Sequence, residues 1–442
     1  MQNMLLLLIG ILPTKNDLVL EQNFKLHKIW ILPFLPFVRV YHPDTIRPLL
    51  KKDGLRNSSY FGVLHRLTLN YNSLVACDDK VVVNEQRPIM NKFFTRKSLT
   101  SYHVEISNAT ETLIENIEKK LKMKKRCSVN LFPLLTRLLV EIHLKIFVSF
   151  DSTKNSRNID EYISAEQELS KLKHNRNKKW YLYPDFVYYL TPNGIKDFFL
   201  VRRIRSLVKV WLHSKQRNQN TYDSYHIMNE LIKKSGQHFT DNVLSMVATT
   251  RNVVSATLNV LYHLAKYPQY QQIIRAEVKG LFDGKKIRAD LLEEDFFKLQ
   301  NTMMFVKEVL RTHPPVNFTE RQITEVVEID GITFPKGTYF HIDIYGLHHN
   351  EALWDKPEEF RPERFADTSN PQSTDGLMFL PFMAYSRECI AKQFSIEEIV
   401  IIVALILQRF EVECDDNFVM SKEKIKHIPE NGVRMYFKSI SD

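Results

Sequence analysis

The most informative stretch of this sequence is FLPFMAYSRECIA, residues 379–391. It places Cys389 in a loop just before a strongly apolar helical segment, with Arg387 two residues upstream. A helix N-terminus and a nearby cation both stabilise the thiolate form of a cysteine. A single cysteine is more often a small buried hydrophobic residue, so the stretch needs support from the patterns around it.

Three further patterns precede this loop. The first is EVLR, residues 308–311, in which Glu308 and Arg311 share one face of a helix and can pair. Such a pair alone means little, because most are surface pairs that contribute little free energy. The second is Arg321 with the hairpin that follows it. The third is FRPERF, residues 360–365, which contains Arg364.

The periodicity predicts a mainly α-helical protein with a small β portion, and no domain boundary is visible within residues 1–442. Residues 24–48 indicate short strands, and residues 134–150 are one of several amphipathic helices. Residues 241–266 contain no Gly or Pro, which predicts one continuous helix that ends before Pro268. Residues 326–341 alternate and carry turn residues, which predicts hairpin strands.

The composition excludes several classes of protein. Lys and Arg total 61 against 51 Asp and Glu, and 61 − 51 gives a net charge of +10. No RNA- or DNA-binding motif accompanies this charge, so we expect no nucleic acid partner. The 4 cysteines form no CxxC pair, which argues against a zinc site or a disulfide scaffold. The 12 glycines are few for a chain of 442 residues.

Together, the four patterns resemble the cytochrome P450 superfamily: its E-x-x-R helix, its PERF-like segment and its cysteine loop, in that order. The segment LYHLAKYPQYQ, residues 261–271, is especially similar to the fatty-acid ω-hydroxylases of family four. The resemblance covers nearly the whole chain. It implies the cytochrome P450 fold, a single domain that we expect to be monomeric, and haem b as the cofactor, which the residue at position 248 predicts to be non-covalently bound.

The resemblance also implies roles for individual residues. Cys389 would be the axial thiolate on the haem iron, and Phe382 would pack against the ring. Arg387, Arg321 and Arg87 would pair with haem propionates, since a guanidinium suits a carboxylate. Glu308, Arg311 and Arg364 would form a structural ion-pair triad.

The distal helix departs from the family pattern. An acid followed by an alcohol, which the family is thought to use to relay protons, corresponds here to Arg251 and Asn252. An arginine stays protonated and cannot serve in this way. Thr249, Thr250 or Asn252 could still organise a water molecule, or the relay is lost. Ala248 stands where many family-four members carry a glutamate that can link to haem, so no ester can form.

The cysteine loop departs as well. Two family glycines correspond to Tyr385 and Ala391, and a tyrosine would be strained at residue 385 if its φ is positive. Glu388 adds a negative charge beside the thiolate, which should raise the pKa of Cys389. The helix that carries Arg87 lacks the family's tryptophan. We therefore expect haem to be held less tightly than in a typical relative.

The implied activity is that of a haem-thiolate monooxygenase, which inserts one oxygen atom into a lipophilic substrate, with the ω-position of a fatty acid as the candidate site of attack. Electrons would come from NADPH through a flavoprotein reductase, and the basic charge suits an acidic partner. The alternatives are a catalytically impaired haem-binding or sensor protein, and a haem-free protein that uses the fold for interactions.

By resemblance, the protein would lie at the cytoplasmic face of the endoplasmic reticulum membrane. The family's N-terminal anchor is not evident: the apolar run at residues 4–12 is too short to span a bilayer. The chain is therefore truncated or makes only peripheral membrane contact. Residues 181–189, YLYPDFVYY, either face a membrane at a substrate entrance or simply pack.

Overall fold

The computed structural model describes residues 26–32, 35–51, 73–74, 80–121, 126–150, 156–182, 184–214, 227, 230, 239–282, 295, 298–366, 376–415 and 433–440. Most of these residues are helical. The longer helices are α5 (Lys80–Asn91), α6 (Arg96–Leu121), α7 (Leu131–Val148), α8 (Ser156–Asn177), α10 (Pro192–Ser214), α12 (Phe239–Ala248), α13 (Thr250–Lys266), α14 (Pro268–Phe282), α16 (Gln300–Thr312) and α18 (Lys392–Arg409).

Short helices connect the longer elements. They are α3 (Pro43–Lys51), α9 (Asp185–Tyr188), α17 (Ile344–His348) and the 3-10 helices η1 (Lys92–Phe94), η3 (Trp180–Leu182), η6 (Pro362–Phe365) and η8 (Tyr385–Arg387). The strands are β1 (Leu26–Leu32), β2 (Leu35–Val40), β3 (Cys127–Asn130), β4 (Phe318–Gln322), β5 (Val327–Ile329), β6 (Ile332–Phe334), β7 (Tyr339–Asp343), β8 (Phe410–Cys414) and β9 (Arg434–Ser439).

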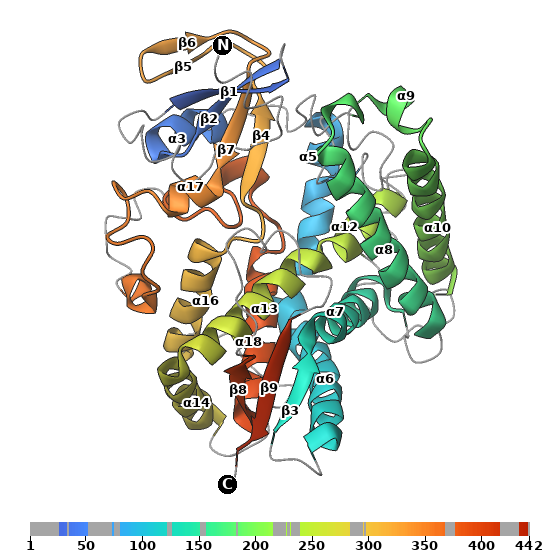
Figure 1. Cartoon of the computed structure of the whole chain (residues 1–442), viewed down its shortest axis with the longest axis vertical. Helices are drawn as coiled ribbons and strands as arrows, with labels where there is room; N and C mark the ends of the chain where they lie inside the picture. Colours follow the sequence, from blue (N-terminus) through green and yellow to red (C-terminus); the bar gives the residue numbers. More distant parts are fainter. Residues whose placement is uncertain are drawn as a thin grey trace.

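The strands form small sheets at two ends of the helical body (Figure 1). One sheet has the order β1-β2-β7-β4, with β2 and β7 parallel and the other pairs antiparallel. The second has the order β3-β9-β8, and β5 and β6 form a separate hairpin. This arrangement confirms the prediction of a mainly α-helical fold with a small β portion.

Helix α18 lies in the main hydrophobic core. Every residue from Ile396 to Leu407 is buried, and apart from Glu397 and Glu398 the sequence is apolar around the whole helix rather than on one face. A second, smaller core joins the four-stranded sheet to α3 and includes Ile46, Phe340 and Leu380. Leu380 belongs to the cysteine loop, so this loop lies between the sheet and the helical body.

The predicted hairpin at residues 326–341 is confirmed in its first turn. Asp330 and Gly331 have φ values of 54° and 74°. Positive φ at both central residues gives the turn geometry that two-residue hairpins prefer. The following strand, β7, pairs with β2 and β4 rather than with β6. The helix predicted over residues 134–150 is also present, as α7.

The prediction of one continuous helix over residues 241–266 was wrong. The structure has α12 and α13, separated at Thr249. The Thr249 hydroxyl donates to the carbonyl of Met246 at 2.9 Å, and the amide of Asn252 donates to the Thr249 carbonyl at 2.9 Å. Threonine side chains that bond their own backbone in this way compete with regular helix geometry.

In the part of the chain that the structure describes, no helix is both long and apolar enough to cross a membrane. The apolar run at residues 4–12 lies outside the described residues.

Candidate functional site

Cys389 lies in a tightly folded loop that ends at the start of α18. The amide of Cys389 donates to the Phe382 carbonyl at 2.9 Å, which turns the chain back on itself. Met383 and Tyr385 have φ values of 62° and 57°, the left-handed region that non-glycine residues rarely adopt. The cysteine is exposed, and the amide of Lys392, the first residue of α18, donates to its carbonyl. The loop therefore presents a thiol at a helix N-terminus.

Two arginines lie close to this thiol. Arg87 of α5 donates from Nη2 to the Glu388 carbonyl at 2.6 Å. Its pKa is lowered, first by burial and then by the charge of Arg387, while Cys389 and Glu388 act in the opposite direction. The structure thus brings together Cys389, Arg387 and Arg87, three of the residues predicted to bind the cofactor. The Glu388 carboxylate accepts from Lys392 Nζ at 2.8 Å, so a cation accompanies its charge.

The other two predicted cofactor-binding residues are Arg321, in the four-stranded sheet, and Phe382, in the cysteine loop itself. Arg321 is buried in β4, and its Nη1 donates to Thr319 Oγ1 at 3.2 Å and to the Glu320 carbonyl at 2.7 Å. Phe382 is half-buried and packs against the main core. Helix α3 shares a hydrophobic core with the sheet that contains Arg321, and it also packs against η8 in the cysteine loop.

Glu308, Arg311 and Arg364 form one buried cluster. Arg311 donates from Nε and Nη2 to the two oxygens of Glu308, at 2.8 and 2.9 Å. Arg364 of η6 donates from Nε to Glu308 Oε1 at 3.1 Å. The remaining donors of Arg311 reach the carbonyls of His348 and Pro357, each at 2.8 Å. Every guanidinium nitrogen of Arg311 has an acceptor, and these contacts tie α16 to the segment that precedes the cysteine loop.

His348 extends this cluster to the cysteine loop. Its Nδ1 is 3.1 Å from the Arg311 carbonyl, and its Nε2 accepts from the Leu380 amide at 2.9 Å. An imidazole that accepts at Nε2 and donates at Nδ1 is neutral. Burial lowers the pKa of His348 to about 3, and the charges of His349 and Arg311 act in the same direction.

The start of the helix segment that carries His348 is fixed by Asp343. Asp343 Oδ1 accepts from the Gly346 amide at 2.9 Å, and Oδ2 accepts from Arg39 Nε at 2.9 Å. A Cβ on Gly346 would lie 2.5 Å from Asp343 Oδ2, so only glycine fits at this position.

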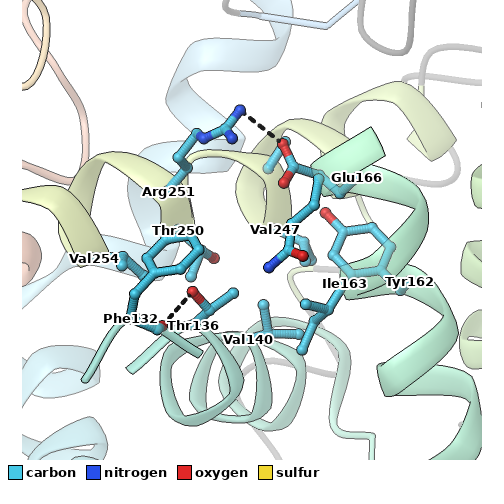
Figure 2. A pocket seen from close by; sticks show the side chains of 12 residues that line it. Phe132, Thr136, Val140, Tyr162, Ile163, Glu166, Val247, Thr250, Arg251 and Val254 are labelled. Atoms are coloured by element: carbon cyan, nitrogen blue, oxygen red, sulfur yellow. Dashed lines mark hydrogen bonds and ion pairs between the residues drawn. The ribbon is translucent and has the colours of Figure 1, made fainter. Parts of the chain in front are cut away.

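Two of the residues predicted to form the distal relay make contacts with other helices. Thr250 Oγ1 lies 2.8 Å from His143 Nδ1 of α7. Arg251 pairs with Glu166 of α8 at 3.3 Å and also contacts Ser170. Figure 2 shows the Arg251–Glu166 ion pair across a pocket between α7, α8 and the α12–α13 segment. Asn252, the third predicted residue, is exposed.

A family model described as cytochrome P450 matches residues 11–433. The chain belongs to the cytochrome P450 family. This P450 is 30% identical to cytochrome P450 4F6 of Rattus norvegicus over 96% of this chain and 82% of the relative. It is 29% identical to the ultra-long-chain fatty acid omega-hydroxylase of Homo sapiens, over 94% of this chain and 82% of the relative. It is also 29% identical to leukotriene-B4 omega-hydroxylase 3 of Mus musculus, over 93% and 82%.

The family uses haem, and the residues of this P450 suit that cofactor. A thiol beside two guanidinium groups offers a soft anionic ligand for iron and two cationic partners for carboxylates. An exposed cysteine at a helix N-terminus is available as a ligand, whereas the buried Cys127 is not. The donor set around Cys389 therefore fits a haem-thiolate centre.

The sequence reasoning missed the histidines of this P450. His103, His143 and His348 are buried and hydrogen-bonded to residues far away in the chain. No local spacing connects any of them to its partner, because the partners lie on other helices or, for Leu380, in the cysteine loop. The resemblance offered no signal either, since none of the motifs that carried it contains these histidines.

Proposed function

We propose that this P450 is a haem-thiolate monooxygenase that inserts one atom of molecular oxygen into a lipophilic substrate, and that fatty acids hydroxylated at the ω-position are the substrate class. The observation that carries the proposal is the loop that presents Cys389 at the N-terminus of α18, beside Arg87 and Arg387. The names of two relatives support the substrate class, since both are ω-hydroxylases.

Cys389 would hold the haem iron, and Arg87, Arg387 and Arg321 would hold its carboxylates. The bound haem would supply the activation of oxygen that no amino acid side chain can provide. The Cys389 thiolate would donate electron density to the iron, which favours cleavage of the O–O bond. Met383 and Tyr385 hold the loop in its turned-back form, and the Phe382 carbonyl anchors the amide of Cys389. Because Ala248 carries no carboxylate, the haem would be bound non-covalently.

On the distal side, Asn252 would be the residue that organises water. Its side chain is exposed, whereas the Thr250 hydroxyl lies 2.8 Å from His143 and Arg251 pairs with Glu166. An amide can donate and accept hydrogen bonds but does not take up a proton at neutral pH. We therefore propose that proton delivery depends on ordered water at Asn252 and is slow.

A second candidate is a haem-binding or sensor protein without turnover, and the engagement of Thr250 and Arg251 by other helices favours it. Turnover separates the two candidates. Purified protein would be supplied with NADPH, a flavoprotein reductase and a fatty acid carrying deuterium at the ω-carbon. A hydroxylated product supports the monooxygenase, whereas tightly bound haem without product supports the sensor.

The partner that supplies electrons would be an NADPH-dependent flavoprotein reductase. Cationic side chains gather around the cysteine loop: Arg87 and Arg387 lie near Cys389, Lys392 pairs with Glu388, and Lys307 lies near Lys392. The pKa of Lys307 is lowered by burial and then by the charge of Lys392. An acidic flavoprotein domain would complement this surface and would be steered toward the thiolate side of the haem.

We propose peripheral membrane contact through an apolar surface on η3, α9 and the first half of α10. Its members are exposed large side chains: Tyr181, Phe186, Leu190, Ile195, Phe198 and Phe199. Phe186 and Leu190 are 75% and 81% exposed, which is unusual for apolar side chains of this size. Lys178, Lys179 and Arg202 are exposed near it and would meet anionic headgroups. This contact would hold the protein at the cytoplasmic face of the endoplasmic reticulum.

A further inference from the structure

Helix α18 contains two adjacent carboxylates in an otherwise apolar, buried stretch. Glu397 is 4% exposed and Glu398 is fully buried. Burying an ionised carboxylate costs free energy unless partners compensate for the loss of water. Two such residues in the middle of one helix therefore need specific partners on the neighbouring helices.

Each carboxylate has a buried histidine as its partner. Glu397 Oε2 lies 2.8 Å from His103 Nε2 of α6, and Glu397 Oε1 accepts from Gln393 at 2.7 Å. Glu398 Oε2 lies 3.1 Å from His143 Nε2 of α7. Both histidines are 3% exposed, so water screens neither contact.

The second pair continues to the distal helix. His143 Nδ1 lies 2.8 Å from the hydroxyl of Thr250, the first residue of α13 after the interruption at Thr249. Thr250 is buried. A chain of three side chains thus links α18, which follows the cysteine loop, to the point where the distal helix is broken.

These contacts constrain α18 in a way that its apolar residues cannot. A helix that is apolar on all sides can rotate or slide with little loss of burial, whereas buried hydrogen bonds have one satisfactory geometry. Consecutive residues of an α-helix point about 100° apart, so Glu397 and Glu398 reach two different helices. Together they fix both the rotation of α18 and its position along its axis. Buried polar groups are known to specify register in this manner.

We propose that the His103–Glu397 and His143–Glu398 pairs are a register lock for α18, and that Thr250 extends this lock to the distal helix. Helix α18 begins three residues after Cys389, so its position sets that of the thiol. The four residues are positioning residues, and their importance for iron ligation rests on the function proposed above. The lock itself requires no haem.

The test replaces the His143–Glu398 pair and Thr250 by apolar residues of similar volume: His143→Phe, Glu398→Met and Thr250→Val together. The rings of Phe147 and Phe394 lie 5.4 and 5.5 Å from His143, so an aromatic side chain suits that position. The control is Glu161→Gln with Arg203→Gln, which removes an exposed ion pair between α8 and α10. Amide hydrogen exchange of the purified full chain is measured by mass spectrometry.

The proposal predicts that the apolar variant stays folded but exchanges at least about tenfold faster in α18 and residues 379–391, while α14 exchanges as before. The control should exchange normally everywhere. The single variant Glu398→Gln keeps a hydrogen-bonding group at this position. Its α18 should therefore retain most of the protection against exchange that the natural chain shows. Normal exchange of α18 in the apolar variant would overturn the proposal. If that variant does not fold, His143→Gln alone is judged by the same comparison of α18 with α14.

A second readout connects the lock to Cys389. In the carbon monoxide complex of the reduced protein, the apolar variant should divide between thiolate-type and non-thiolate Soret bands, and the control should not. A single thiolate band in the apolar variant would mean that the lock does not position Cys389. Because hydrogen exchange needs neither haem nor turnover, failure of the lock and failure of the proposed function are distinguishable.

Discussion

Arg311 Nε lies 2.8 Å from Glu308 Oε2, and both side chains are completely excluded from solvent. Glu308 Oε1 also accepts from the Arg361 amide at 2.9 Å and from Arg364 Nε at 3.1 Å. One carboxylate therefore joins helix α16 to the segment that leads toward the cysteine loop. An arrangement of this kind is costly to break, because removing one partner leaves the others buried without compensation.

We predict that Glu308→Gln lowers the free energy of unfolding by about 3–5 kcal/mol, the usual effect of breaking a buried ion pair. Urea unfolding followed by tryptophan fluorescence measures this change. Glu161→Gln, which removes an exposed ion pair with Arg203, is the control and should change the midpoint very little. A Glu308 variant as stable as that control would show that the cluster is not structural.

His348 predicts a dependence of stability on pH. Burial lowers its pKa to about 3, against about 6.5 in an unfolded chain. Between these two pH values the His348 side chain is protonated in the unfolded state but not in the folded state. Its contribution to the free energy of unfolding is therefore complete above pH 6.5 and is lost as the pH decreases toward 3. The loss for this one group approaches about 1.4 kcal/mol per pH unit.

His348→Gln tests this pH dependence, since its amide oxygen can still accept from the Leu380 amide but does not titrate. Urea unfolding at pH 7, 6 and 5 should show a shallower loss of stability in the variant than in the natural chain. Parallel slopes would contradict the assignment of a neutral, buried His348. His263, whose pKa burial lowers to about 4, remains in both proteins and cancels in the comparison.

The distal helix gives a prediction about turnover. Arg251→Asp with Asn252→Thr restores the acid and alcohol of the family, but Glu166 would then face a carboxylate instead of its cation. We therefore expect the best result when Glu166→Gln is added. The ratio of product formed to NADPH consumed should rise severalfold over the natural chain. An unchanged ratio in this triple variant would contradict the account of the relay, and Glu166→Gln alone is its control.

The apolar surface around α9 gives a prediction about membranes. Phe186→Ser, Leu190→Ser and Phe199→Ser together should release the protein from vesicles that contain anionic lipid, as measured by co-sedimentation. The side chains are exposed, so thermal stability should stay unchanged. Substitution of the exposed apolar residues Val326 and Ile332 in the β5–β6 region by Ser is the matched control. Equal binding of both variants would exclude this surface as the contact.

Much of the fold could be predicted from local patterns. The Asp330-Gly331 turn, the helix over residues 134–150 and the pairing of Glu308 with Arg311 follow from spacing alone. Tyr385 stands where the family has a glycine, which raised the question of a positive φ at this residue. In the structure the φ of Tyr385 is 57°. A non-glycine residue in that region costs about 1–2 kcal/mol, which the loop must recover elsewhere.

The interruption at Thr249 and the buried histidine contacts could not be predicted in this way. The interruption is confined to Thr249, whose φ and ψ of −68° and −15° remain in the helical region. Helical periodicity is therefore the same with or without it. The His143–Glu398 contact joins residues 255 positions apart in the sequence. Only the packing of α7 against α18 brings them together, so no pattern within either helix reveals the pair.

The central claim is that Cys389 is a thiolate ligand of haem iron. Its most direct test is the difference spectrum of the reduced protein with carbon monoxide, recorded for the natural chain and for Cys389→Ser, with Cys414→Ser as the control. The account predicts a thiolate-type Soret band in the natural chain and in the control, and its loss in Cys389→Ser. A natural chain that binds no haem, or a thiolate band that survives in Cys389→Ser, would contradict it.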